Sequence, residues 1–132
     1  VAVLCNEGDL DVEEFQWICY NYILGLPLET EHYWDIPNGK TFSRPEMLCG
    51  DYLCREGLPV HCVVKWEDGV LRGTYQDRKV LLRYCGENIF TAVDAGQPEK
   101  RVTTLRFYTR NGSAWGVKCG SRIYQRVPDA RP

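Results

Sequence analysis

The sequence has few of the residues on which catalytic sites usually depend. Its 132 residues include only two histidines, His32 and His61, and one methionine. It contains no glycine-rich phosphate-binding loop, no Gly-x-Ser-x-Gly nucleophile elbow and no His-Glu-x-x-His zinc motif. It also lacks a run of about 18 apolar residues, which a membrane-spanning helix needs. These absences argue against an enzyme, predict no metal or cofactor, and predict no membrane-spanning helix.

Cysteine, in contrast, is abundant, and its frequency exceeds that of typical cytosolic proteins. The seven cysteines are Cys5, Cys19, Cys49, Cys54, Cys62, Cys85 and Cys119. Six of them could form three disulfides, although the sequence does not give the pairing, and the seventh could link two chains covalently. We therefore expect a disulfide-crosslinked protein.

A glycosylation motif points to the same compartment as the cysteines. Asn111-Gly112-Ser113 matches the acceptor pattern for N-linked glycans, and it falls where we expect a hairpin turn. A turn exposes the acceptor to solvent. Together with the cysteine count, this motif predicts a secreted glycoprotein that is modified at Asn111.

The charge is distributed unevenly along the chain. Residues 1–60 carry 11 acidic and three basic side chains, a net charge of −8, whereas residues 61–132 carry 13 basic and seven acidic side chains, a net charge of +6. Either the basic half binds an anionic partner, or the two halves attract each other within one fold.

The chain after residue 59 has the signals of an antiparallel sheet. Short segments of β-branched and aromatic residues are separated by turn pairs such as Asp68-Gly69 and Asn111-Gly112. The expected strands are Val60–Glu67, Val70–Tyr75, Lys79–Cys85, Asn88–Val93, Val102–Thr109, Ala114–Cys119 and Ile123–Val127. The sequence thus predicts a mainly β fold, a small antiparallel barrel or sandwich of about six to eight strands.

The N-terminal part has a different character. Asp11 to Glu14 resemble a capping box, and apolar residues then recur at helical spacing until Gly25, although the aromatic residues also alternate as in a strand. We favour one N-terminal helix. Asn38-Gly39 could close a hairpin between Tyr33–Ile36 and Lys40–Phe42.

We expect a single domain over residues 1–132. Its acidic helix and loop segment, residues 1–59, would pack on the sheet of residues 60–127, and residues 128–132 would form a frayed tail.

Two of the expected strands carry alternating basic and aromatic side chains. Arg106, Tyr108 and Arg110 share one face of their strand, opposite Leu105 and Phe107. Arg122, Tyr124 and Arg126 share one face of the last strand. The alternative is that these rows form a solvated face of the sheet and pair with the acidic N-terminal segment packed across it.

If the two strands are neighbours, their guanidinium and phenol groups form a surface suited to polyanions. Tyr33 and Trp34, in a proline-flanked loop, could add aromatic contacts to a sugar ring or to a protein surface. The leading hypothesis is a secreted, non-enzymatic binding protein for a polyanionic glycan or an acidic protein surface. The sequence pI of about 5.7 argues against nucleic acid as the ligand.

Residues 102–116 resemble a hairpin of jacalin-type lectins, over 15 residues of general strand pattern. This resemblance is too short to assign the chain to that family, but it agrees with a lectin-like binding function.

Three alternatives stay open. The first is a small secreted hydrolase that uses His61 or His32 with a carboxylate. The second is a zinc site formed by Cys49, Cys54, His61 and Cys62. The third is an assembly protein whose chains are joined by the odd cysteine.

Overall fold

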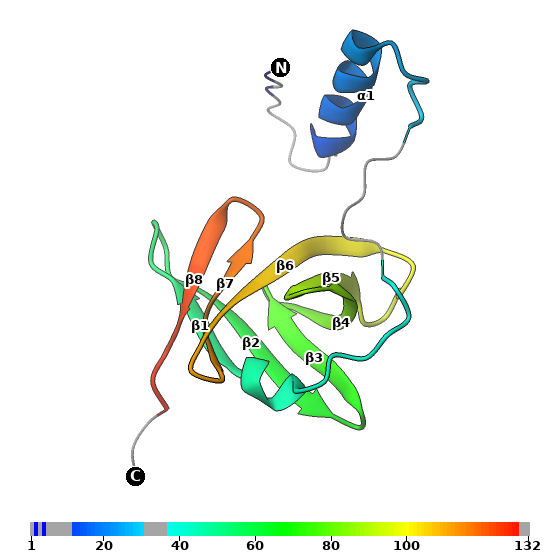
Figure 1. Cartoon of the computed structure of the whole chain (residues 1–132). Helices are drawn as coiled ribbons and strands as arrows, with labels where there is room; N and C mark the ends of the chain where they lie inside the picture. Colours follow the sequence, from blue (N-terminus) through cyan, green and yellow to red (C-terminus); the bar gives the residue numbers. More distant parts are fainter. Residues whose placement is uncertain (1, 3, 5–11, 31–36, 130–132) are drawn as a thin grey trace. The chain divides into compact units, whose positions relative to one another are not determined.

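The structure is a computed structural model that describes residues 2, 4, 12–30 and 37–129 (Figure 1). The chain divides into two compact units, residues 1–34 and residues 35–132. The prediction that the N-terminal segment packs on the sheet stays a prediction. The predicted tail, residues 128–132, lies mostly outside the described residues.

The first unit contains the predicted helix. α1 spans Val12–Leu24 and ends at Gly25, whose φ of 68° stops the helix as expected for a glycine after the last turn. The buried amide of Asn21 donates hydrogen bonds to the carbonyl oxygens of Leu28 and Thr30, both at 2.9 Å, which fixes the following turn. The helical interpretation is therefore confirmed, and Asp11 of the expected capping box lies outside the described residues. No helix in the described part of the chain is long and apolar enough to cross a membrane.

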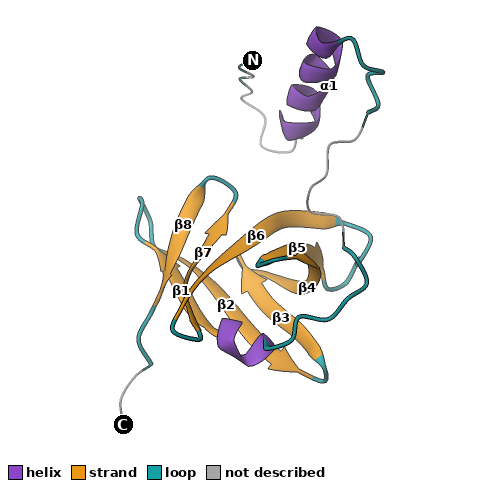
Figure 2. Cartoon of the chain, viewed as in Figure 1, coloured by secondary structure: helices purple, strands orange, loops and turns teal. Residues whose placement is uncertain are grey.

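The second unit is an eight-stranded closed antiparallel barrel (Figure 2). Its strands are β1 (Gly50–Cys54), β2 (Val60–Glu67), β3 (Val70–Tyr75), β4 (Arg78–Gly86), β5 (Ile89–Asp94), β6 (Arg101–Arg110), β7 (Ser113–Cys119) and β8 (Arg122–Arg126). Each strand pairs with the next along the chain, and β8 closes the barrel against β1. The mainly β prediction is confirmed, with a barrel rather than a sandwich.

Turn chemistry explains why the strand prediction was accurate. Both residues of the Asp68-Gly69 and Asn111-Gly112 turns have positive φ, as two-residue hairpins require. These turns set the ends of the strands through residues that are adjacent in sequence.

The segment before β2 differs from the prediction. The structure contains β1 and a short 3-10 helix, η1 (Pro45–Leu48), within the stretch that we expected to be helix and loop. Lys40–Phe42 is not a strand, and Tyr33–Ile36, its expected partner, lies outside the described residues.

The antiparallel order places successive turns at alternate ends of the barrel. One end, here called the η1 end, carries η1 and the turns at residues 68–69, 87–88 and 111–112. η1 packs on this end through Leu48, which is fully buried, and the hydroxyl of Tyr52 donates a 2.6 Å hydrogen bond to the Leu48 carbonyl oxygen.

The barrel is filled by the inward side chains of its strands. Phe90 and Phe107 meet edge to face, with their ring centroids 5.6 Å apart, and Tyr52 packs against Phe107 in the same way. Toward the opposite end lie Cys54, Cys62 and Cys119, all buried.

The predicted disulfides are not supported. No two of the six described cysteines form a disulfide, and Cys5 lies outside the described residues. Cys54, Cys62 and Cys119 point inward from strands and fill core volume, which buried cysteine often does as a small apolar residue. Cys62 and Cys119 are hydrogen-bonded neighbours from β2 and β7, but their sulfurs are not bonded.

Candidate functional site

The structure separates the predicted basic and aromatic face into two parts, one on β6 and one on β8. Leu105 and Phe107 of β6 are buried, as expected. Because side chains alternate along a strand, Arg106 and Tyr108 lie on the outer surface of the barrel. Arg122, Tyr124 and Arg126 lie on the inward side of β8. The predicted six-residue face is therefore wrong as a single surface, although two of its arginines, Arg110 and Arg126, line one groove.

Tyr124 is the clearest correction. It is only 2% exposed and belongs to the core, where its ring packs near Tyr75. The prediction that Tyr124 shares one side of the strand with Arg122 and Arg126 agrees with the structure, but that side faces the barrel interior. Charged residues fit on that side only because they occupy the two ends of β8, about 13 Å apart along the strand.

Arg122 and Arg126 consequently have different surroundings. Arg122 lies at the end away from η1, with its Nε 3.9 Å from Oε2 of Glu56, and both side chains are more than half exposed. Arg126 lies at the η1 end. Its Nη1 donates hydrogen bonds to Ser113 Oγ at 2.6 Å and to the Ala114 carbonyl oxygen at 3.4 Å.

Arg110 and Arg126 both line a shallow groove of about 330 Å³ beside the β6–β7 turn. We call this the arginine groove, and it is lined by Arg110, Asn111, Ser113, Ala114, Trp115, Arg126 and Pro128. The side chain of Arg110 is exposed, whereas Arg126 is half-buried and fixed by its hydrogen bonds. No carboxylate is among the described residues that line the groove.

A bulge presents an aromatic ring at this groove. The β6–β7 register shifts after Tyr108, which leaves Trp115 as the extra residue between the pairs Tyr108–Gly116 and Thr109–Ala114. The Trp115 ring stacks on that of Tyr108, with centroids 5.5 Å apart and planes inclined by 27°. Trp115 stays 42% exposed, so its outer face is open to a ligand.

A third guanidinium group, which sequence reasoning missed, approaches from the loop before η1. A β-carbon placed on Gly112 would lie 3.3 Å from Nη2 of Arg44, so Arg44 reaches the β6–β7 turn. Arg44 is exposed. It lies in a loop with no strand alternation, and nothing in the local sequence indicated this contact.

Several predicted residues cannot be placed. Tyr33, Trp34 and His32 lie outside the described residues. Asn111, the predicted glycosylation site, is described, and it is exposed in the β6–β7 turn with a φ of 52°.

His61 does contact a carboxylate, as the hydrolase alternative requires. Its Nδ1 lies 2.8 Å from Oδ1 and 3.0 Å from Oδ2 of Asp51. The two side chains are 52% and 42% exposed on the outer surface of β1 and β2, and neither lines the arginine groove. The structure thus provides a candidate base and a carboxylate that orients it, but places both on an open surface.

The four residues of the zinc alternative do not converge. Cys54 and Cys62 face the barrel interior, whereas His61 lies on its outer surface. No cluster of three or more potential metal ligands occurs among the residues that the structure describes.

Comparisons with known proteins add no family assignment. No protein-family model matches the chain, and neither the curated proteins nor the solved structures include a match. Its function is therefore argued from the residues of the barrel alone.

Proposed function

We propose that the chain is a non-enzymatic binding protein that recognises a polyanionic ligand, preferentially a sulfated glycan, through the arginine groove. The observation that carries this proposal is the convergence of Arg110 and Arg126 on one groove beside the exposed ring of Trp115.

The chemistry of these groups suits sulfated sugars. A guanidinium group pairs with a sulfate or carboxylate through two parallel hydrogen bonds, and it loses less hydration energy than an ammonium group does. The Trp115 ring offers an apolar surface for the face of a sugar ring. Because Arg126 is already fixed by Ser113 and Ala114, little side-chain freedom is lost when it binds an anion.

The neighbouring outer surface extends the positive charge. Arg106 of β6 lies directly opposite Lys118 of β7, and both side chains are exposed. Like charges at directly opposed positions destabilise a sheet, so this pair opposes folding unless an anion neutralises it. A long polyanion could span this pair and the arginine groove together.

The proposed ligand implies an extracellular protein, as the cysteine count and the sequon predicted. The absence of a disulfide among the described residues adds no support to that location. An acidic protein surface is the competing ligand for the same groove, and the experiment below separates the two.

The test is affinity for immobilised heparin and, in parallel, for a poly-glutamate peptide, each measured over a range of salt concentrations. We expect heparin to bind more tightly and its affinity to fall steeply with salt, because bound cations are released from the polyanion. Arg110→Gln and Arg44→Gln should each lower the slope of log affinity against log salt by about one unit. Arg78→Gln removes the same charge from an exposed position at the other end of the barrel and is the matched control.

Two results would contradict the proposal. Equal losses for Arg78→Gln and Arg110→Gln would show that only the net charge matters. Tighter binding of poly-glutamate than of heparin would assign the groove to an acidic protein.

The contact between His61 and Asp51 favours one second candidate, the hydrolase. If it is correct, His61→Ala abolishes turnover of a broad panel of ester, glycoside and peptide substrates, and Asp51→Asn reduces it. Neither substitution should change heparin affinity, so the two functions can be told apart. The third alternative, a chain dimer through the odd cysteine, is tested by intact mass without reductant.

A further inference from the structure

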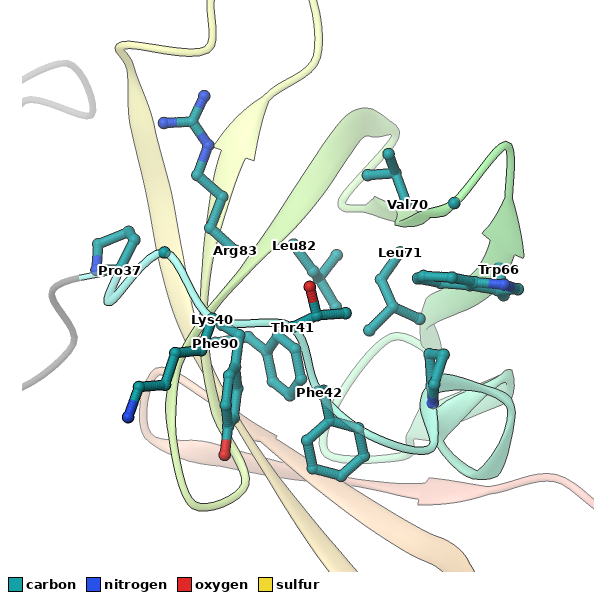
Figure 3. A pocket seen from close by; sticks show the side chains of 14 residues that line it. Pro37, Lys40, Thr41, Phe42, Trp66, Val70, Leu71, Leu82, Arg83 and Phe90 are labelled. Carbon is teal, nitrogen blue, oxygen red and sulfur yellow. The ribbon is translucent and has the colours of Figure 1, made fainter.

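The barrel is incompletely paired between β3 and β4. The ladder joins Arg72–Tyr75 to Arg78–Leu81, but Val70 and Leu71 of β3 do not pair with Leu82 and the following residues of β4. The two strands diverge toward the η1 end. At this position the structure contains a pocket of about 230 Å³ (Figure 3).

The pocket, here called the β3–β4 pocket, is lined mainly by apolar side chains. Leu71 and Leu82, from the two diverging strands, line it together with the ring of Trp66, and the ring of Phe42 forms a further wall (Figure 3). Phe42 packs against Tyr84 and Phe90, with ring centroids 5.4 and 5.6 Å apart, so that wall is a fixed aromatic cluster.

The loop of residues 37–45 forms part of the lining and is attached to β4. The backbone amide of Asn38 donates a 3.1 Å hydrogen bond to the carbonyl oxygen of Tyr84, and the Asn38 side chain accepts one from the amide of Lys40. Asn38 thus bonds to β4 as a neighbouring strand would. The rest of the loop does not, so the space next to Leu71 and Leu82 stays open.

The rim of the pocket is positively charged. Among the described residues that line the pocket, the only ionisable side chains are those of Lys40 and Arg83 and the phenol of Tyr84. Both cations are exposed, and their side chains extend away from the two leucines and to opposite sides of the pocket (Figure 3). An apolar interior with two cations at the rim is complementary to a molecule with an apolar tail and an anionic head.

We propose that the β3–β4 pocket binds a small amphipathic carboxylate, with its apolar tail against Leu71, Trp66 and Phe42 and its carboxylate at one of the two rim cations, Lys40 or Arg83. This site is separate from the arginine groove, because the two share no lining residue. The inference does not depend on the proposed glycan function.

The probes are sodium hexanoate, sodium octanoate and octanol, added below the micellar range to the full chain. Binding is followed by tryptophan fluorescence and by amide shifts in nitrogen-15 NMR spectra. We expect saturable binding with shifts at residues 37–45, 66–71 and 82–90. Each added methylene should strengthen binding about fourfold, which corresponds to about 0.8 kcal/mol of transferred apolar surface.

The carboxylate and the tail are tested by separate substitutions. Lys40→Gln with Arg83→Gln should weaken octanoate up to about fivefold, the range of an exposed ion pair, and leave octanol unchanged. Trp66→Ala should weaken both probes. Thr41→Phe, at an exposed loop position that lines the pocket, should exclude both without removing a core residue.

Trp115→Ala is the matched control, since Trp115 and Trp66 are equally exposed, 42% and 40%. Trp115→Ala should reduce heparin binding and leave octanoate binding unchanged. Trp66→Ala should reduce octanoate binding and leave heparin binding unchanged. The inference is overturned if octanoate causes no saturable shift, if the shifts map to the exposed apolar side chains of α1 instead, or if octanol and octanoate respond alike to loss of Lys40 and Arg83.

Discussion

Gly50 lies directly against the guanidinium group of Arg126. A β-carbon at Gly50 would be 2.9 Å from Arg126 Nε, and the φ of Gly50 is 157°, at the edge of the region that favours glycine. Because Gly50 has no side chain, the guanidinium group of Arg126 can lie against the start of β1.

Gly50→Ala should therefore affect both stability and binding. We expect a loss of about 1–3 kcal/mol in the free energy of unfolding, from the strained backbone, and weaker heparin binding, because the guanidinium of Arg126 must move. Urea denaturation and heparin affinity measure the two effects. Gly57→Ala, also at positive φ but with open space around it, should lose stability alone.

Alkaline conditions should destabilise the barrel through its buried phenols. Burial raises the pKa of Tyr52 and of Tyr124 above the ordinary value near 10. In the unfolded chain these groups lose their protons near pH 10, while in the barrel they stay neutral. Stability is thus intact below pH 10 and falls above it, by about 1.4 kcal/mol per pH unit for each of the two tyrosines.

Phenol absorbance during a pH titration checks this expectation, with unfolding followed by circular dichroism. Ionisation of Tyr52 and Tyr124 near pH 10, before any loss of structure, would contradict it.

Thiol accessibility should follow burial. Cys54, Cys62 and Cys119 are at most 3% exposed, and the hydrogen bond with Cys62, followed by burial, raises the pKa of Cys119. Because a reagent reaches a sulfur only where it is exposed, these three should react with a maleimide only after unfolding, while the partly exposed Cys19, Cys49 and Cys85 react earlier. Intact mass after timed exposure counts the modified thiols. If unfolding without reductant left two of these six unmodified, the protein would contain a disulfide after all.

A glycan on Asn111 should block the arginine groove, because Asn111 is one of its lining residues. Protein from a glycosylating host should bind heparin more weakly than unglycosylated protein, and Asn111→Gly should abolish the difference. Glycine is the appropriate replacement since it tolerates the positive φ of this position. Equal affinity of the two glycoforms would place the heparin contacts elsewhere.

The strands after residue 59 could be predicted from sequence because alternation and turn chemistry are local signals. β2 and β3 begin and end where they were expected, at Val60–Glu67 and Val70–Tyr75. β1 was missed because Cys49 and Cys54, at its two ends, were interpreted as disulfide residues around a tight segment.

The site was harder to predict because it depends on which side of each strand faces the core. In β6 the apolar Leu105 and Phe107 indicate which side faces the core, so the outward position of Arg106 could be predicted. In β8 the inward row contains two arginines, and only the barrel geometry shows that they lie at its two ends around the buried Tyr124. Arg44 and the bulge at Trp115 arise from long-range contacts that no local pattern reports.

The closure of the barrel depends on a short seam. β1 and β8 are joined by the pairs Tyr52–Arg126 and Leu53–Gln125, together with the hydrogen bond from the Val127 amide to the Asp51 carbonyl oxygen. Every other strand pair joins neighbours in sequence and can form early, whereas this seam joins residues more than 70 positions apart and bears the largest loop-closure entropy. Proteolysis that removed β8 would expose the edges of both β1 and β7, and such unpaired edges are templates for aggregation. The last five residues of the sheet therefore protect the protein against self-association.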